Sequence, residues 1–270
     1  MKKFKILLPF LMLTTMTLSI SAKVLIISDI DDTLKVSSAR NTVDMISTYK
    51  TTSAFMGMSF LLNTLKAQYQ NELDIQYVTA AVDSIVGSDT VKKSHLNFLA
   101  INKFPKGSTY FRSSFFEKDY KLTTIRNIVK KANPDQIILI GDNADKDEPI
   151  YFKLKNEFDK KGIKTLAFIH RIHKNEKENY QPVFNSSIIS YVTSAEIAAD
   201  LLNLSLMNSF SYNQFLSNQL PKIIANDSNT TIGDQEIAFP KYLNCKEYNW
   251  SLSSNKELDT LKNILAKKCK

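Results

Sequence analysis

The chain has 270 residues, which limits it to one large domain or one domain with a small appendage, and 43% of them are hydrophobic, enough for a substantial core. Its formal net charge of +8 favours anionic partners, including lipid headgroups. The basic residues are spread along the chain and no motif indicates binding to nucleic acid, so a nucleic-acid partner is not expected.

The first 22 residues are typical of a signal peptide. Three lysines precede an apolar run at 6–20, and Ala22 ends a small-residue cleavage site. The run is short for a membrane span, and the alternative, an uncleaved anchor, would leave little linker before the first strand. We therefore expect a periplasmic or secreted protein. Loss of the three lysines would lower its formal net charge from +8 to +5.

An apolar run that ends in aspartates opens the mature chain. Val24–Ile27 has the composition of a strand that is buried on both faces of a parallel sheet. Asp29, Asp31 and Asp32 follow at its carboxyl end, the edge at which open α/β sheets bind ligands. Such close carboxylates repel one another unless a cation or phosphate chemistry uses them. The plain alternative is an acidic turn exposed to water.

Strands and helices alternate along the rest of the chain, which predicts an α/β fold with a doubly wound parallel sheet. The segment between the first two strands is short, so it forms a small lid or a crossover helix and leaves a minimal cap. The pattern predicts strands at 75–80, 108–112, 136–140, 164–169 and 188–192, and helices at 43–69, 89–99, 120–132, from about 149 to 160, and at 194–204.

The pattern divides the chain into three parts: a signal peptide at 1–22, an α/β domain at 23–206 and a C-terminal extension at 207–270. Beyond position 208 the pattern weakens, with a polar loop at 226–231 and a short terminal helix at 258–266. We expect the extension to be mostly helical and to pack on the domain. In an exported protein, Cys245 and Cys269 suggest a disulfide that ties the last segment back on itself.

Four strand ends carry the parts that phosphoryl transfer needs. Asp29 is the candidate nucleophile, and Asp31 is the candidate acid and base. The Thr79 hydroxyl can bind a phosphoryl oxygen. Lys121, at the start of the helix after Asp119, can neutralise developing charge and hold the nucleophile, with Lys118 as its nearest competitor.

A second acidic cluster follows the strand at 136–140. Asp142, Asp145 and Asp147 offer hard oxygen ligands that suit Mg²⁺. The plain alternative is an acidic helix start, because Asp and Glu favour a helix N-terminus. His170 and His173 fit a polar rim better than a metal pair. Asp32 has no derived chemical role and is expected to be solvated or to pair with a lysine such as Lys35.

These residues, taken together, resemble the motifs of the haloacid dehalogenase superfamily, and more closely the App1-like phosphatidate phosphatase catalytic domain. The similarity covers about 24–171. It implies a Rossmann-like (Rossmannoid) fold, an aspartyl-phosphate on Asp29, and Mg²⁺ bound by Asp29, the main-chain carbonyl of Asp31, Asp142 and Asp147. The segments that carry the resemblance are, in chain order, Ser28–Lys35, Tyr77–Thr79, Phe104–Gly107, Tyr120–Leu122, Gly141–Asp147 and the Pro-Ile-Tyr that starts at Pro149.

The sequence therefore predicts an exported Mg²⁺-dependent phosphomonoesterase, with a phosphatidate-like lipid at a membrane surface as the favoured substrate. One segment departs from the family: 79–82 is Thr-Ala-Ala-Val, where relatives resemble Ser-x-Ser-Pro-Trp. Asn143 also replaces a usual serine. Two alternatives stay open, a phosphatase of soluble esters such as nucleotides or sugar phosphates, and a catalytically silent secreted binding protein. The sequence does not indicate an oligomeric state.

Overall fold

A computed structural model describes residues 22–38, 50–83, 89–114, 116–144, 146–173, 188–226, 236–246, 248–250 and 256–270. The predicted signal peptide, apart from Ala22, lies outside these residues, as do the polar loop beyond position 226 and Asp145. Among the residues that the structure describes, no helix is long and apolar enough to cross a membrane.

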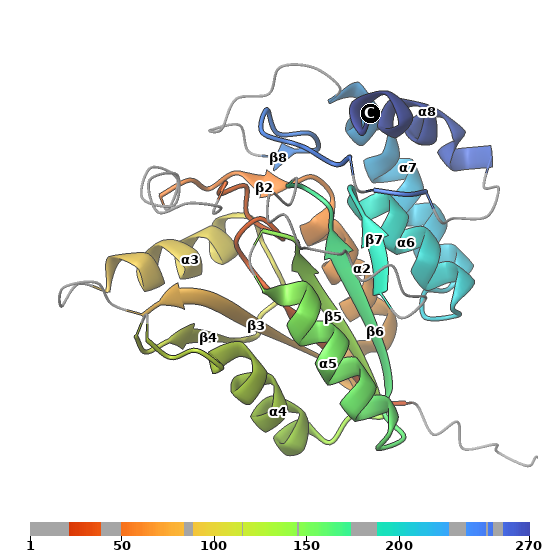
Figure 1. Cartoon of the computed structure of the whole chain (residues 1–270). Coiled ribbons are helices and arrows are strands. Elements are labelled where there is room, and N and C mark those ends of the chain that lie inside the picture. Colours follow the sequence, from red (N-terminus) through yellow and green to blue (C-terminus); the bar gives the residue numbers. More distant parts are fainter. Residues whose placement is uncertain are drawn as a thin grey trace, which may run out of the picture.

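The centre of the fold is a six-stranded parallel sheet with the strand order β4-β3-β1-β5-β6-β7, which confirms the predicted α/β class (Figure 1). β1 lies between β3 and β5, so its carboxyl end is at the middle of one edge. The strands are β1 (Val24–Ser28), β3 (Leu73–Val82), β4 (Ser108–Arg112), β5 (Gln136–Asp142), β6 (Lys164–His170) and β7 (Ile188–Tyr191).

Helices cover both faces of the sheet, and the alternation of side chains explains why. Along β1, Val24 and Ile26 belong to one hydrophobic cluster, whereas Leu25 and Ile27 belong to a second one on the other face. In Figure 1, α4 (Tyr120–Ala132) and α5 (Asp147–Asp159) cover one face, and they contribute to the second cluster. The first cluster contains side chains of α2 (Met58–Tyr69), α3 (Thr90–Ile101), α6 (Ser194–Asn203) and α7 (Ser209–Ala225).

Two predicted elements differ in the structure. The helix expected at 43–69 begins only at Met58, because Gly57 has the left-handed φ of 78° and a short strand, β2 (Ala54–Phe55), precedes it. Residues 39–49 of that prediction lie outside the described part. The strand expected at 75–80 extends to Val82, so Thr79 does not end it, and its pairing with β4 is irregular between Val78 and Val82.

The C-terminal region is more regular than the sequence predicted. No bounds for α7 follow from the sequence, because polar residues dilute its apolar positions. Asn208 is its N-cap, and the Asn208 side chain accepts from the Ser211 N–H. The helix is followed by β8 (Glu236–Ile237), which pairs with β2, and by α8 (Asp259–Lys268). The structure confirms the Cys245–Cys269 disulfide. Leu261 and Leu265 of α8 belong to the same hydrophobic cluster as the sheet, so the extension packs on the core.

Candidate active site

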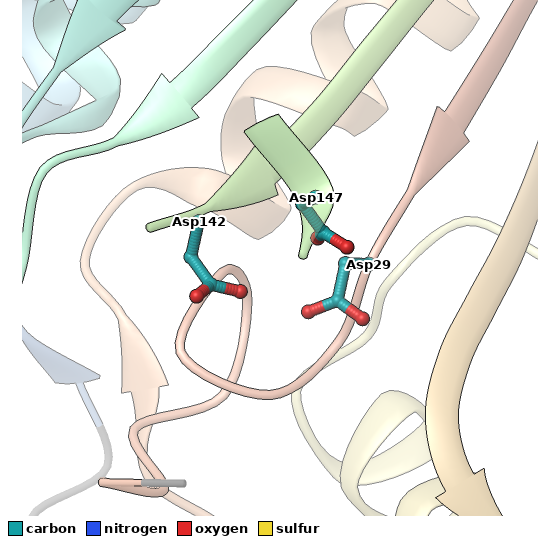
Figure 2. Close-up of side chains that lie close together, drawn as sticks. All are labelled: Asp29, Asp142 and Asp147. Atoms are coloured by element: carbon teal, nitrogen blue, oxygen red, sulfur yellow. The ribbon is translucent and has the colours of Figure 1, made fainter. Parts of the chain in front are cut away.

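Three carboxylates converge at the carboxyl edge of the sheet, where Figure 2 shows them turned toward one another. Asp29 follows β1, Asp142 ends β5 and Asp147 begins α5. β1 and β5 are parallel neighbours, and the Asp29 N–H donates to the Ile140 carbonyl at 2.8 Å, which fixes the two strand ends together. Ligand oxygens of all three aspartates lie within 4.8 Å of one another, and each residue is buried.

Lys121 from α4 reaches this carboxylate cluster. Its Nζ donates to Asp29 Oδ1 at 2.7 Å and also to Asp147 Oδ1. Burial alone would lower the pKa of Lys121, but the neighbouring carboxylates of Asp147 and Asp29 raise it well above its usual value. The competing candidate, Lys118, is exposed. The structure thus brings Lys121 and not Lys118 to the predicted nucleophile.

The charge of the cluster fits a bound cation. Burial raises the pKa of Asp29 to about 7, against the opposing effect of Lys121, and burial also raises the pKa of Asp142 well above its usual value. Three buried carboxylates around one ammonium therefore hold a proton or attract a divalent ion. Oxygen donors of this kind suit Mg²⁺, with water and a phosphate completing the shell.

Two small residues allow the carboxylates to approach. The Thr33 hydroxyl lies 3.2 Å from Asp29 Oδ2 and 3.3 Å from Asp142 Oδ2, between the two strand ends. A Cβ on Gly141 would lie 2.4 Å from Asp147 Oδ2, which no real Cβ contact tolerates. Glycine at position 141 is therefore needed to place Asp147 beside β5.

Asp31 points to a different set of partners. Its side chain is 20% exposed, against 4% for Asp29, so it can reach solvent or a leaving group. Its Oδ2 accepts from Thr79 Oγ1 at 3.3 Å and lies 2.7 Å from His95 Nε2. Burial would raise the pKa of Asp31, but the charge and hydrogen bond of His95 lower it well below its usual range. That the main-chain carbonyl of Asp31 is a metal ligand stays a prediction.

His95 is a site residue that the sequence did not reveal. The ring is buried, and its Nδ1 lies 2.8 Å from the Val91 carbonyl oxygen one helical turn earlier. A carbonyl only accepts, so Nδ1 carries a hydrogen, and the 2.7 Å contact between Nε2 and Asp31 requires a second proton between the two groups. His95 thus links the side chain of Asp31 to α3 through one hydrogen bond. Only its place on α3, close to the sheet edge, could have indicated it.

One of the two predicted environments of Asp32, exposure to solvent, was wrong. Its side chain is completely buried, and Oδ2 lies 2.9 Å from His173 Nε2. The Lys35 ammonium lies 3.9 Å from Asp31 Oδ1, and burial lowers the pKa of Lys35 against the opposing charges of Asp31 and Asp32, so the expected influence of Lys35 on Asp32 is present. His170 and His173 are buried rather than on a polar rim, and the ring nitrogens of His170 lie 2.8 and 2.9 Å from the main-chain carbonyl oxygens of Asp32 and Val192. Both histidines therefore contact Asp32 and hold the segment that follows β1.

Asn143 connects the second acidic cluster to the same histidines. Its Oδ1 accepts from the N–H groups of Ile172 and His173 at 3.1 and 3.0 Å, and its Nδ2 donates to the His173 carbonyl. The turn after β6 is fixed further by Arg171, whose guanidinium pairs with buried Glu148 through two bonds of 2.7 and 2.6 Å. The asparagine that departs from the family pattern thus holds this turn.

A parallel sheet with buried acidic residues and a lysine at its carboxyl edge is an arrangement that fits phosphoryl transfer. Comparison with family models gives the particular family: the model described as "Phosphatidate phosphatase APP1, catalytic domain" matches residues 24–167, and the chain belongs to this family. Both the predicted family and the predicted enzyme class are confirmed. A search of curated proteins finds no match. The family match ends within β6 and does not include the C-terminal region.

Proposed function

We propose that this phosphatase is an exported, Mg²⁺-dependent phosphomonoesterase that forms an aspartyl-phosphate on Asp29. The observation that carries the proposal is the buried cluster of Asp29, Asp142 and Asp147 with Lys121 at the carboxyl edge of the sheet. The family match supports the proposal as well, because the matching model describes the catalytic domain of a phosphatidate phosphatase.

Each side chain has a distinct part in the reaction. The Asp29 carboxylate attacks phosphorus, and the bond from phosphorus to the ester oxygen breaks. Asp31, which its low pKa leaves ionised, relays the proton of the His95–Asp31 hydrogen bond to the departing oxygen, and it later accepts a proton from the water that hydrolyses the phosphoenzyme. Lys121 orients Asp29 and offsets charge on the phosphoryl group. Thr79, whose hydroxyl donates to Asp31 Oδ2 in this structure, is the proposed donor to a phosphoryl oxygen once substrate is bound.

Asp29, Asp142 and Asp147 would hold the cation. Magnesium bound there supplies Lewis-acid polarisation of the phosphoryl oxygens. Lys121 already neutralises part of the charge of Asp29 and Asp147, so a cation held there would share these carboxylates with the ammonium. Asp145, the other acidic residue of this segment, lies outside the described residues.

Export is part of the proposal, with cleavage after Ala22 and a domain division at about 206. The Cys245–Cys269 disulfide supports an oxidising compartment. The backbone just after Ala22 is held to the domain, because the Lys23 N–H donates to Asp135 Oδ2 at 2.8 Å. The intact mass of the exported protein tests the cleavage point, and a mass that retains residues 1–22 would contradict it.

Phosphatidate is the favoured substrate because of the family match, and a substrate panel tests this choice. We expect phosphatidate in mixed micelles to give a kcat/KM at least about tenfold above that of nucleotide and sugar phosphates, with Mg²⁺ required and EDTA abolishing turnover. A preference for soluble esters would replace the lipid by the second candidate substrate class. No turnover of any ester would instead support a silent binding protein.

Cation binding should depend on pH, since a proton competes for the same carboxylates. The pKa of Asp29 rises from 3.8 to about 7 on folding, so the stability that this proton contributes is present at low pH and is lost as the pH rises from about 4 to 7. Mg²⁺ must displace that proton. The apparent affinity is therefore expected to be about 100-fold weaker at pH 5 than at pH 8.

Thermal unfolding with and without Mg²⁺ measures this effect without any substrate. The increase in melting temperature should be clear at pH 8 and small at pH 5. A control titration uses Asp259→Asn, since Asp259 is exposed on α8 and lies outside the carboxylate cluster. An increase that is equal at both pH values would contradict the assignment of the cation to Asp29.

A further inference from the structure

The C-terminal extension reaches the loop that carries the proposed catalytic residues. We call residues 29–38, which follow β1, the catalytic loop. Tyr242, far along the chain from this loop, donates its hydroxyl hydrogen to Asp32 Oδ1 at 2.7 Å and accepts from the Ser38 N–H at 3.3 Å. Its ring stacks on His173 with centroids 5.4 Å apart and an interplanar angle of 11°. One tyrosine thus contacts the catalytic loop at two positions, Asp32 and Ser38.

Asp32 is the residue through which the loop is held. It has a left-handed backbone with φ of 56°, a conformation that residues other than glycine adopt at a cost unless their surroundings fix it. Its side chain supplies that fixing: Oδ1 accepts from the N–H groups of Ser37 and Ser38 at 3.2 and 2.8 Å as well as from Tyr242. The carboxylate therefore closes the loop on itself, and Tyr242 fixes the carboxylate.

The orientation of Asp31 depends on this arrangement, because Asp31 immediately precedes Asp32. Asp31 must keep its side chain within 2.7 Å of His95 Nε2 while Asp29, two residues earlier, stays with Lys121. A change in the backbone at Asp32 would rotate the neighbouring peptide and move Asp31 away from His95. The contacts of Asp32 thus control the direction of the proposed acid and base.

The extension is itself held in place on both sides of Tyr242. Before it, β8 pairs with β2, and β2 in turn bonds to the loop, since the Phe55 N–H donates to the Leu34 carbonyl at 2.8 Å. After it, the Asn244 N–H donates to the Ile172 carbonyl at 2.9 Å, and Cys245 is joined to Cys269 at the end of α8. Tyr242 therefore approaches the loop from a rigid support.

We propose that Tyr242 is a positioning residue of this phosphatase, and that the C-terminal extension completes the active site by holding Asp32 and, through it, Asp31. The inference rests on the proposed function of Asp31. It assigns a role to a region that lies beyond the family match, which ends at residue 167. It also gives a functional reason for the contact between the extension and the loop at the carboxyl edge of the sheet.

The test compares two tyrosines of the same extension. Tyr242→Phe removes the hydroxyl on Asp32, whereas Tyr248→Phe removes a hydroxyl that hydrogen-bonds to the buried Glu196 carboxylate of α6. Both changes remove one bond to a buried carboxylate, but only the first affects the catalytic loop. With the best ester from the substrate panel, Tyr242→Phe should lower kcat about 10- to 100-fold with KM changed less than about threefold. Tyr248→Phe should keep kcat within about twofold of the wild type.

Amide hydrogen exchange in the loop gives a readout that does not require activity. The amides of Asp32, Ser37 and Ser38 should exchange about tenfold faster or more in Tyr242→Phe and at the wild-type rate in Tyr248→Phe. Equal kcat and equal exchange in the two variants would overturn the role of Tyr242. If the wild type hydrolyses no ester, the proposed function fails, while faster exchange in Tyr242→Phe alone would still support the structural link between extension and loop.

Discussion

Replacement of Asp29 by asparagine is expected to reduce kcat by about four orders of magnitude or more, because an amide cannot attack phosphorus. Asparagine has nearly the shape of aspartate, so its side-chain oxygen can still accept the 2.7 Å bond from Lys121. The measurement is phosphate release from the best ester of the panel. Asp259→Asn is the matched control and should retain the wild-type rate.

Stability separates a chemical loss from a folding defect in this variant. Burial makes the charge of Asp29 unfavourable, as its pKa of about 7 shows, so the neutral asparagine should leave the melting temperature of the cation-free protein at pH 8 equal or higher. A hydroxylamine-sensitive phosphoprotein should form with the wild type and not with the variant. Turnover by Asp29→Asn at the wild-type rate would remove Asp29 as the nucleophile.

Lys121→Met should lower both activity and stability. Methionine fills a similar volume but leaves the Asp29 and Asp147 carboxylates without the ammonium that both contact. Breaking a buried ion pair in this way costs about 3–5 kcal/mol in the free energy of unfolding, in the absence of a cation and near pH 7.5. The loss of a donor to the phosphoryl group should lower kcat about 100- to 1000-fold.

The matched control is Lys118→Met, since Lys118 is exposed and only three residues away. It should change the free energy of unfolding by less than about 0.5 kcal/mol. The destabilisation of Lys121→Met should decrease at pH 5, where protons neutralise carboxylates whose pKa is raised, and on addition of Mg²⁺. Equal stability of the two variants at pH 7.5 would contradict the structural assignment of Lys121.

The sequence by itself determined the sheet and most of the acidic centre. Apolar runs such as Val24–Ile27 require cover on both faces of the strand, and the alternation with helices supplies that cover in a parallel sheet. The carboxyl ends of parallel strands share one edge, so Asp29 and Asp142 had to lie there together. These results depend on local pattern and on rules of chain connection, both of which can be read from the order of residues.

Only the tertiary structure decided which polar groups meet. The sequence favours Lys121 over Lys118 only by its place at a helix start, whereas the structure buries Lys121 on α4 and leaves Lys118 exposed before that helix. Asp32 and Tyr242 are separated by 210 residues, and His95 and Asp31 by 64, so no local periodicity links them. Each pair forms because packing of distant elements leaves a buried carboxylate that must find a hydrogen-bond donor. The cost of leaving such a carboxylate without a donor arises only when packing buries it. The donor therefore cannot be predicted before the positions of the packed elements are known.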